Sequence, residues 1–292
     1  MNVEVLKERA RIVSAIRRFF DDQGFVEVET AVRIEAPAPE EHIDCPPVEG
    51  GGYLRASPEL QMKKLLAAGM DRIYQIGPCF REGEKGSRHN PEFTMIEWYR
   101  REAGYLDIAK DLKSLVSSLM SLTGWEDFRR KTEDAELSFE TISVRDAYLR
   151  YAGWDPWEGA WDQDRFDFDM ATKIEPAIKE LGGGVFLMDY PPQAASLAKL
   201  RGDVAERWEF YWDGLELANC FTELCDKDEQ MRRFEKAKES RKLLKESDYP
   251  TDYEFIDSLP KIGSAAGVAL GVDRLVMILT KTKEISAVRA QI

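Results

Sequence analysis

The chain has 292 residues, of which 43% are hydrophobic and 11% aromatic, enough to bury a core in one large domain or two modest ones. Its formal net charge of -13, from 54 acidic and 41 basic residues, argues against a broad nucleic-acid-binding surface and leaves room for a local basic patch. The first residues lack a basic region followed by an apolar stretch, and no apolar run approaches roughly 18 residues, so we expect a cytoplasmic protein.

Helices and strands are both predicted in the first 70 residues. Apolar residues recur at helical spacing from Leu6 to Phe20, Gly24 follows as a stop signal, and residues 25–30 have the composition of a strand. Residues 35–52, rich in proline and glycine, form a loop long enough to lie across a site. A second helix is predicted over residues 57–68, because Ser-Pro-Glu is a typical helix start.

An arginine-rich polar loop separates two strand-like segments between residues 80 and 100. Along the second strand, residues 93, 95, 97 and 99 share one face, which carries Phe93, Glu97 and Tyr99. The loop and its entry supply donors that suit phosphate or carboxylate. These residues are Arg81, Arg88, His89 and Asn90. Taken alone, the segment is also compatible with a β-hairpin that carries a charged, solvated loop.

The middle of the chain continues the mixed pattern. Residues 105–122 are predicted to be helical, and the acidic, aromatic region 126–183 is interpreted as an insertion with helices of its own. Its tryptophans are expected to serve packing. The four cysteines, Cys45, Cys79, Cys220 and Cys225, form no CxxC pair and are interpreted as buried or incidental thiols.

Two strand-like runs meet at Asp213-Gly214, a hairpin signal, within residues 207–226. Glu209 and Glu216 offer paired carboxylates that suit magnesium bridging phosphates. Strict alternation, however, places Glu216 on the opposite face from Glu223. Either a bulge near residues 217–219 or a metal held toward the strand edge is needed to reconcile the two positions. Residues 267–279 read as a glycine-interrupted strand that runs into a helix, with Arg274 at the helix start.

In this order, the segments resemble the three signature motifs of the class II aminoacyl-tRNA synthetases, specifically the catalytic domain of the lysine enzymes. Residues 25–30 correspond to motif 1, residues 80–100 to motif 2 and residues 271–274 to motif 3, so the resemblance spans nearly the whole chain. It implies an α+β fold with an antiparallel sheet flanked by helices, a single catalytic domain over residues 1–292, bound ATP with Mg²⁺, and a homodimer formed through motif 1.

The resemblance also implies roles for individual residues. Arg81 would bridge the α-phosphate and the substrate carboxylate, and Arg88 and Arg274 would hold the outer phosphates. The other nucleotide and metal positions are Glu84, His89, Asn90, Phe93, Glu209 and Glu216. The amino-acid positions are Ser57, Glu59, Glu97, Tyr99, Asn219, Phe221, Glu223 and Ala269. Among these, Glu97, Tyr99 and Glu223 would meet the far ammonium of lysine, whereas Glu59 and Asn219 would bind the near amine and carboxylate.

Several positions depart from the lysine enzymes. The sequence begins about two dozen residues before motif 1, without room there for an anticodon-binding module, so tRNA is not expected as the acceptor. Ala269 stands where the lysine enzymes have glycine, and Ser57 stands where they have alanine. This combination resembles the truncated paralogues that attach (R)-β-lysine to a lysine of elongation factor P. α-Lysine stays open as the substrate.

Two further departures concern adenine and the dimer. Gly83 occupies the usual position of the first acid of motif 2, and we favour Glu84 over Glu82 as its replacement because glycine lets the backbone turn. Ala31 replaces the motif 1 proline. The alternative functions are a lysine-tRNA ligase that grips only the acceptor stem and a non-catalytic regulatory paralogue.

Overall fold

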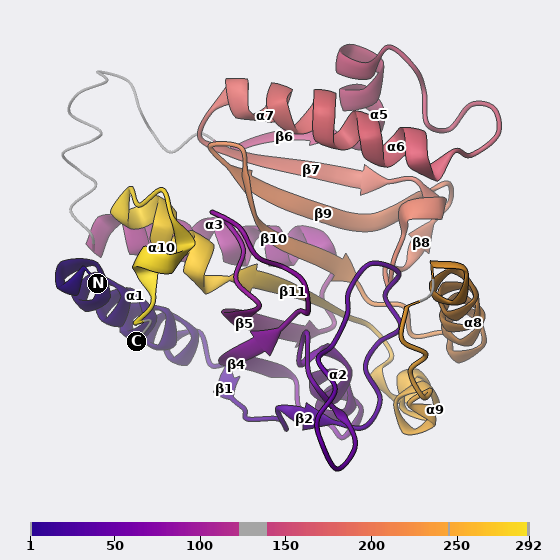
Figure 1. The fold of residues 1–292 in the computed structure, drawn as a ribbon, viewed down its shortest axis with the longest axis horizontal. Coiled ribbons are helices and arrows are strands. Elements are labelled where there is room, and N and C mark those ends of the chain that lie inside the picture. The colour runs from indigo at the N-terminus through magenta and orange to yellow at the C-terminus, as the bar shows by residue number, and fades with distance from the viewer. Residues whose placement is uncertain (1, 123–138, 245, 291–292) are drawn as a thin grey trace. The chain divides into compact units, whose positions relative to one another are not determined.

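The computed structural model describes residues 2–122, 139–244 and 246–290, and the chain divides into two compact units (Figure 1). One unit comprises Met1–Ala103 with Leu224–Ile292, and the other comprises Gly104–Glu223. Each unit contains antiparallel strand pairs flanked by helices, which confirms the predicted α+β class. The predicted single catalytic domain over residues 1–292 stays a prediction.

The first unit contains four strands in the order β1-β4-β5-β11 and a separate small hairpin, β2-β3. The strands are β1 (Val26–Glu27), β4 (Arg72–Phe80), β5 (Glu92–Arg101), β11 (Ala265–Gly271), β2 (Arg33–Ile34) and β3 (Tyr53–Leu54). The helices are α1 (Val3–Asp22), α2 (Glu59–Ala67), α8 (Lys227–Leu244), α9 (Tyr253–Ile262), α10 (Val272–Thr280) and the 3₁₀ turn η4 (Ile285–Val288). β5 pairs antiparallel with β4 on one side and with β11 on the other.

Helix α1 packs against the strands that carry the site. The Asn2 side chain caps its first turn by accepting from two backbone N–H groups, and its apolar stripe ends at the fully buried Phe20. The Phe20 ring stacks on Tyr74 of β4 at 4.9 Å and lies 5.1 Å from the ring of Trp98 of β5. α1 and α10 lie side by side, which brings the two ends of the chain together (Figure 1).

The strand predicted over residues 25–30 is shorter than expected. Only Val26–Glu27 pair with β4, in parallel. At Thr30 the backbone N–H donates to Gln75 Oε1 at 3.0 Å, and the carbonyl accepts from Arg55 Nη1 at 2.9 Å. Side chains thus take the hydrogen bonds that a longer ladder would need, and the strand ends early.

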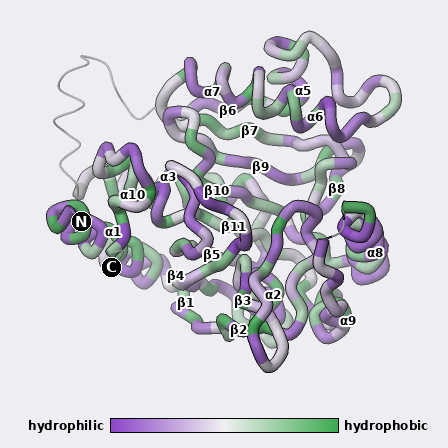
Figure 2. Tube along the Cα trace, viewed as in Figure 1, coloured by the Kyte–Doolittle hydropathy of each residue, from purple (hydrophilic) through white to green (hydrophobic). Residues whose placement is uncertain are grey.

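The long loop at residues 35–52 is held by a hydrophilic helix and by a tyrosine. α8 exposes mostly polar residues (Figure 2), yet Arg241 is fully buried and donates to the Glu40 carbonyl at 2.6 Å and to Asp44 Oδ1 at 2.5 Å. The Tyr249 hydroxyl accepts from the Cys45 N–H at 2.8 Å. A loop of this composition is therefore fixed by partners about 200 residues away in the sequence.

The second unit contains strands in the order β10-β9-β7-β6, with β8 paired to β9. The strands are β6 (Phe139–Ser143), β7 (Gly184–Tyr190), β8 (Leu200–Arg201), β9 (Val204–Trp212) and β10 (Leu215–Thr222). The α-helices are α3 (Tyr105–Leu122), α5 (Val144–Ala147), α6 (Gln163–Asp169) and α7 (Glu175–Leu181), with the π-helical turns η1 (Tyr148–Ala152) and η2 (Met170–Ile174) and the 3₁₀ turn η3 (Pro192–Ala194). α5, α6 and α7 cover β6 and β7 (Figure 1) around one apolar core.

The predictions for this unit are largely confirmed. Helix α3 has the predicted bounds, and β9 and β10 form the hairpin with Asp213 and Gly214 both at positive φ. Residues 139–183 of the predicted insertion contain α5, α6 and α7, and also β6, which pairs parallel with β7 and was not expected; that this region is an insertion stays a prediction. Residues 126–138 of the predicted insertion lie outside the described residues.

The four cysteines are free thiols, three of them buried, as predicted. Within the described ranges, no helix combines the length and the apolar content that crossing a bilayer requires.

Candidate active site

The polar loop between β4 and β5 is a tightly closed hairpin end. The Arg81 N–H donates to the Pro91 carbonyl at 2.9 Å, and Gly86 pairs with His89 near the tip. The Arg81 guanidinium lies over the Phe93 ring at 5.1 Å, and its Nη1 lies 3.5 Å from Glu84 Oε1. The loop therefore holds a cation, an aromatic face and the favoured one of the two candidate acids in one place.

The arginine of the third motif reaches the same loop. Arg274, in the first turn of α10, donates from Nε to the Arg88 carbonyl at 3.3 Å, and its Nη2 lies 2.5 Å from His89 Nε2. Because a guanidinium has only donors, His89 Nε2 must accept, and the imidazole is neutral. Burial and the nearby Arg274 lower the pKa of His89, in agreement with the neutral form. Residues 185 positions apart in the sequence thus meet at one surface.

Two buried donors in this loop point to a ligand. Arg81 Nε and Asn90 Nδ2 are both buried, and among the described residues no group accepts a hydrogen bond from either. Buried donors in native proteins are nearly always paired with protein, water or ligand. With the exposed Arg88 beside them, these donors suit a phosphate or carboxylate group.

A buried carboxylate lies farther along β5. Glu97 is only 1% exposed, and its two oxygens accept from the Ser57 hydroxyl at 2.6 Å and the Tyr99 hydroxyl at 2.7 Å. Burial, and next the charge of Glu59, raise the pKa of Glu97 to about 7. Such a carboxylate suits a ligand ammonium, which would favour its ionised form.

Three more residues shape the surroundings of this carboxylate. Ala269 of β11 lies directly opposite Glu97 in the strand register. Gly267 lies opposite Tyr99, and a Cβ atom there would be 2.1 Å from the tyrosine ring, so only glycine fits. Glu59 forms an ion pair of 2.5 Å with Lys63. Two of the positions at which the sequence departs from the lysine enzymes, 57 and 269, therefore both adjoin Glu97.

A small cavity of about 20 Å³ lies beside Ser57 and Glu59. The far wall comes from the loop at residues 35–52, including Pro37 and Cys45. This volume holds about one water molecule. The long loop therefore lies beside Ser57 and Glu59, two of the residues predicted to bind the amino acid.

In the second unit, the hairpin β9-β10 shows how Glu216 comes to lie on the same face as the later residues of its strand. Its register shifts between Glu216 and Ala218, so Leu217 is an extra residue, as in a β-bulge. Beyond the bulge Asn219 lies opposite Glu209, and before it Glu216 lies opposite Tyr211. Because Glu209 and Tyr211 share a face, the bulge places both carboxylates on that face together with Asn219.

Arg207 contacts several of the predicted site residues of the second unit. Its guanidinium donates to Glu209 Oε1 at 2.5 Å, to Asn219 Oδ1 at 3.2 Å and to the Ala194 carbonyl at 2.8 Å. It also lies over the rings of Tyr190 and Phe221, at 4.2 and 5.8 Å. Three predicted site residues are thus fixed by one cation whose side chain is only 15% exposed. Glu223, also buried, follows β10 and forms an isolated bridge with Ala198.

A model of the class II tRNA synthetases (D, K and N) matches residues 2–290. The chain belongs to this family. Curated relatives named elongation factor P–(R)-β-lysine ligase include the protein of Actinobacillus succinogenes, which is 36% identical over 99% of this chain and 95% of its own length. Those of Proteus mirabilis and Yersinia enterocolitica are 37% and 36% identical, each over 98% of this chain and 94% of their own length. Membership of this synthetase family implies the use of ATP.

Three residues that contact or adjoin the predicted site residues were not themselves predicted: Arg207, Gly267 and Asp273. Arg207 begins the predicted hairpin segment 207–226, but no local signal shows that its side chain is mostly covered. Gly267 carried a signal, because a glycine inside a strand indicates a close approach by another group. Asp273 precedes the predicted site residue Arg274 and is only 1% exposed. The role of an acid such as Asp273 can be inferred only when the tertiary structure shows which side chains it contacts.

Proposed function

We propose that this protein is an ATP-dependent ligase that adenylates (R)-β-lysine and transfers it to a lysine side chain of elongation factor P. The observation that carries this proposal is the similarity to ligases of that name over 94 to 95% of their length. The buried acid Glu97 and the arginines of the hairpin loop support it, because the substrate combines an ammonium group with a carboxylate that must meet ATP.

The first step needs alignment more than acid–base catalysis. The substrate carboxylate is ionised at neutral pH, so one of its oxygens attacks the α-phosphorus of ATP, and the bond to the β-phosphate oxygen breaks to release pyrophosphate. Arg81 is proposed to neutralise the charge that grows on the α-phosphate. Arg88 and Arg274 are proposed to hold the outer phosphates, with Asn90 beside them. Glu84, His89 and Phe93 are proposed to lie around the adenosine part.

The second step transfers the acyl group. The neutral ε-amine of the acceptor lysine attacks the carbonyl carbon of the acyl-adenylate, an amide bond forms, the bond to the phosphate oxygen breaks, and AMP leaves with the electron pair. The acceptor proton passes to solvent or to the leaving phosphate. Orientation and exclusion of water are the contributions expected from this chain.

A magnesium ion fits the acidic face of the hairpin β9-β10. Glu209 and Glu216 share that face, and Mg²⁺ commonly takes one or two carboxylates and completes its shell with phosphate oxygens and water. Within the described part of the chain, no group of three or more His, Cys, Asp or Glu side chains could hold a metal by itself. When bound, the ion would neutralise phosphate charge; Arg207 would keep Glu209 oriented.

The substrate's amine positions are proposed from the buried acids. Glu97 with Tyr99 and Glu223 would hold the far ammonium, while Glu59 and Asn219 would hold the near amine and the carboxylate; Phe221 would line the pocket. Ser57 and Ala269 adjoin Glu97, so we propose that they re-aim the pocket for β-lysine. We further propose a cytoplasmic homodimer with elongation factor P, and not tRNA, as acceptor.

Incubation of the purified protein with ATP, Mg²⁺ and elongation factor P tests this function. Mass spectrometry should find one β-lysyl adduct on a lysine of elongation factor P with (R)-β-lysine, and less with α-lysine. Total tRNA in a parallel reaction should stay uncharged. Charging of tRNA alone would refute the proposal, and absence of ATP–pyrophosphate exchange with every amino acid would instead indicate a non-catalytic protein.

The pair of variants Ala269→Gly and Ser57→Ala tests the proposed choice of substrate. Each restores the residue of the lysine enzymes beside Glu97, so the ratio of pyrophosphate exchange with β-lysine to that with α-lysine should fall. An unchanged ratio in the double variant would contradict the assigned role of these two positions.

A further inference from the structure

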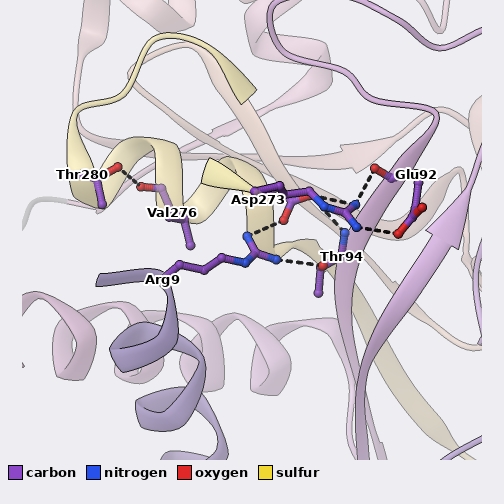
Figure 3. Close-up of polar contacts among 7 residues, drawn as sticks. Arg9, Glu92, Thr94, Asp273, Val276 and Thr280 are labelled. Carbon is purple, nitrogen blue, oxygen red and sulfur yellow. Dashed lines mark hydrogen bonds and ion pairs between the residues drawn. The ribbon is translucent and has the colours of Figure 1, made fainter. Parts of the chain in front are cut away.

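A buried carboxylate anchors the start of α10 to the strand that carries Phe93. Asp273 Oδ1 lies 2.6 Å from Arg9 Nη1, and Asp273 Oδ2 accepts from the Thr94 N–H at 3.1 Å (Figure 3). Arg9 Nη2 also donates to the Thr94 hydroxyl at 2.8 Å. Thr94 directly follows Phe93, and Asp273 directly precedes Arg274. The helix that carries Arg274 is therefore pinned to the strand at the edge of the proposed nucleotide site.

A second arginine joins this anchor from the end of the chain. Arg289 Nη1 lies 3.7 Å from Asp273 Oδ2, and the same guanidinium donates to the Glu92 carbonyl and to Glu92 Oε1, both at 2.5 Å. Glu92 is the first residue of β5, where the hairpin loop ends. Arg289 thus holds the exit of the loop and the start of α10 together.

The same C-terminal segment also contacts the middle of the loop. The Ile285 N–H, at the start of η4, donates to the Ser87 carbonyl at 2.8 Å. Ser87 precedes Arg88, whose own carbonyl accepts from Arg274. The segment 285–289 therefore contacts the loop at Ser87, near its tip, and at Glu92, the residue that directly follows it.

We propose that residues 285–289 form a clasp that fixes the loop 81–91 for ATP, with Arg289 as a positioning residue and Asp273 as its anchor. This inference rests on the proposed function, because it assumes that the loop binds ATP. Arg289 does not need to touch the nucleotide. It acts by keeping Glu92 and the loop exit at a constant distance from Arg274, so that the donors of Arg81, Arg88 and Asn90 converge before the nucleotide arrives.

The main test is Arg289→Gln, measured by ATP–pyrophosphate exchange. Loss of a forked, charge-assisted contact is expected to raise KM for ATP about tenfold, while KM for the amino acid changes less than about twofold. Arg289→Lys should restore part of the affinity because it keeps the charge but not the fork. The matched control is Arg232→Gln, which removes a similar forked contact, to Glu229, between side chains that are 66% and 33% exposed, and it should leave KM for ATP unchanged.

Three further measurements make the outcome decisive. Glu92→Gln should raise KM for ATP less than Arg289→Gln does, because the Glu92 carbonyl still accepts, and the double variant should be no worse than Arg289→Gln alone. Equilibrium binding of ATP should weaken in parallel with KM. A lowered melting temperature with unchanged KM for ATP and unchanged ATP binding would overturn the clasp and leave a purely structural contact.

The failure of the clasp can be told apart from failure of the proposed function. If the wild-type protein binds ATP and the Arg289→Gln variant binds it equally well, the clasp is wrong and the ligase proposal stands. If the wild-type protein binds no ATP, the proposed function is wrong and the clasp falls with it.

Discussion

Replacement of Glu97 by glutamine tests the central feature of the amino-acid pocket. The carboxyl group is buried and raised to a pKa of about 7, against an ordinary value of 4.5. Between these two pH values the folded protein retains a proton that the unfolded chain releases, so the free energy of unfolding falls as pH rises through this interval. Above about pH 7 the loss is complete and constant.

The size of this loss follows from the two pKa values. The difference between about 7 and 4.5 corresponds to about 3 kcal/mol at ~1.4 kcal/mol per pH unit. Most of it, about 2 to 3 kcal/mol, falls between pH 5 and pH 8.5. Glu97→Gln cannot ionise, so its stability should lack this fall; its lost or weakened hydroxyl contacts cost about 1 kcal/mol at both pH values.

Urea unfolding at pH 5 and pH 8.5 measures the effect. The difference in free energy of unfolding between Glu97→Gln and wild type should increase in favour of the variant by about 2 to 3 kcal/mol from the lower to the higher pH. Glu239→Gln, on the exposed face of α8, is the control and should track the wild type. Equal pH dependence of Glu97→Gln and wild type would refute the burial argument.

The same carboxylate should make substrate binding depend on pH. A ligand ammonium favours ionised Glu97, so binding of β-lysine near pH 6 should release a proton, and affinity should rise as pH increases toward about 8. Calorimetric titration in buffers of different ionisation enthalpy measures this proton. In Glu97→Gln the proton release should vanish, and affinity should fall by several kcal/mol, on the order of the 2 to 5 expected when one partner of a buried pair is lost.

Three other variants test the rest of the site. Gly267→Ala should disrupt amino-acid binding, because its Cβ would lie 2.1 Å from the Tyr99 ring; a normal KM for the amino acid would contradict this close packing. Arg207→Met should lower the free energy of unfolding by about 2 kcal/mol, measured by urea unfolding, because the mostly covered Glu209 carboxylate loses its cation; an unchanged free energy of unfolding would show that water replaces the cation. Glu216→Gln should raise the Mg²⁺ concentration needed for half-maximal pyrophosphate exchange, and an unchanged Mg²⁺ requirement would remove Glu216 from the proposed metal site.

Elements whose signals are local were predicted well. Helix α3 has the bounds read from its apolar spacing, and Asp213-Gly214 makes the turn that its composition indicated. The alternation along β5 correctly separated the Glu97 face from the face of Trp98, which packs on α1. These features depend on side-chain period and turn conformation, which neighbouring residues set.

The bulge in β10 could not be predicted from neighbouring residues alone. The sequence left two ways to reconcile Glu216 with Glu223, which strict alternation places on opposite faces, and only the pairing with β9 reveals the bulge at Leu217. The early end of β1 is similar, because side chains from residues 55 and 75 take its hydrogen bonds. In both cases a partner outside the segment decides the outcome.

The amino-acid sequence alone determined which charged and aromatic groups are available, which strand faces carry many of them, and to which synthetase family the chain is related. Only the tertiary structure decided that Arg274 meets His89 and that Asp273 ties α10 to β5. It also decided that Glu97 is desolvated enough to titrate near neutral pH. The physical reason is that burial and electrostatic contact depend on residues that are close in space but up to about 200 positions apart in sequence, and side-chain periodicity carries no information at that range.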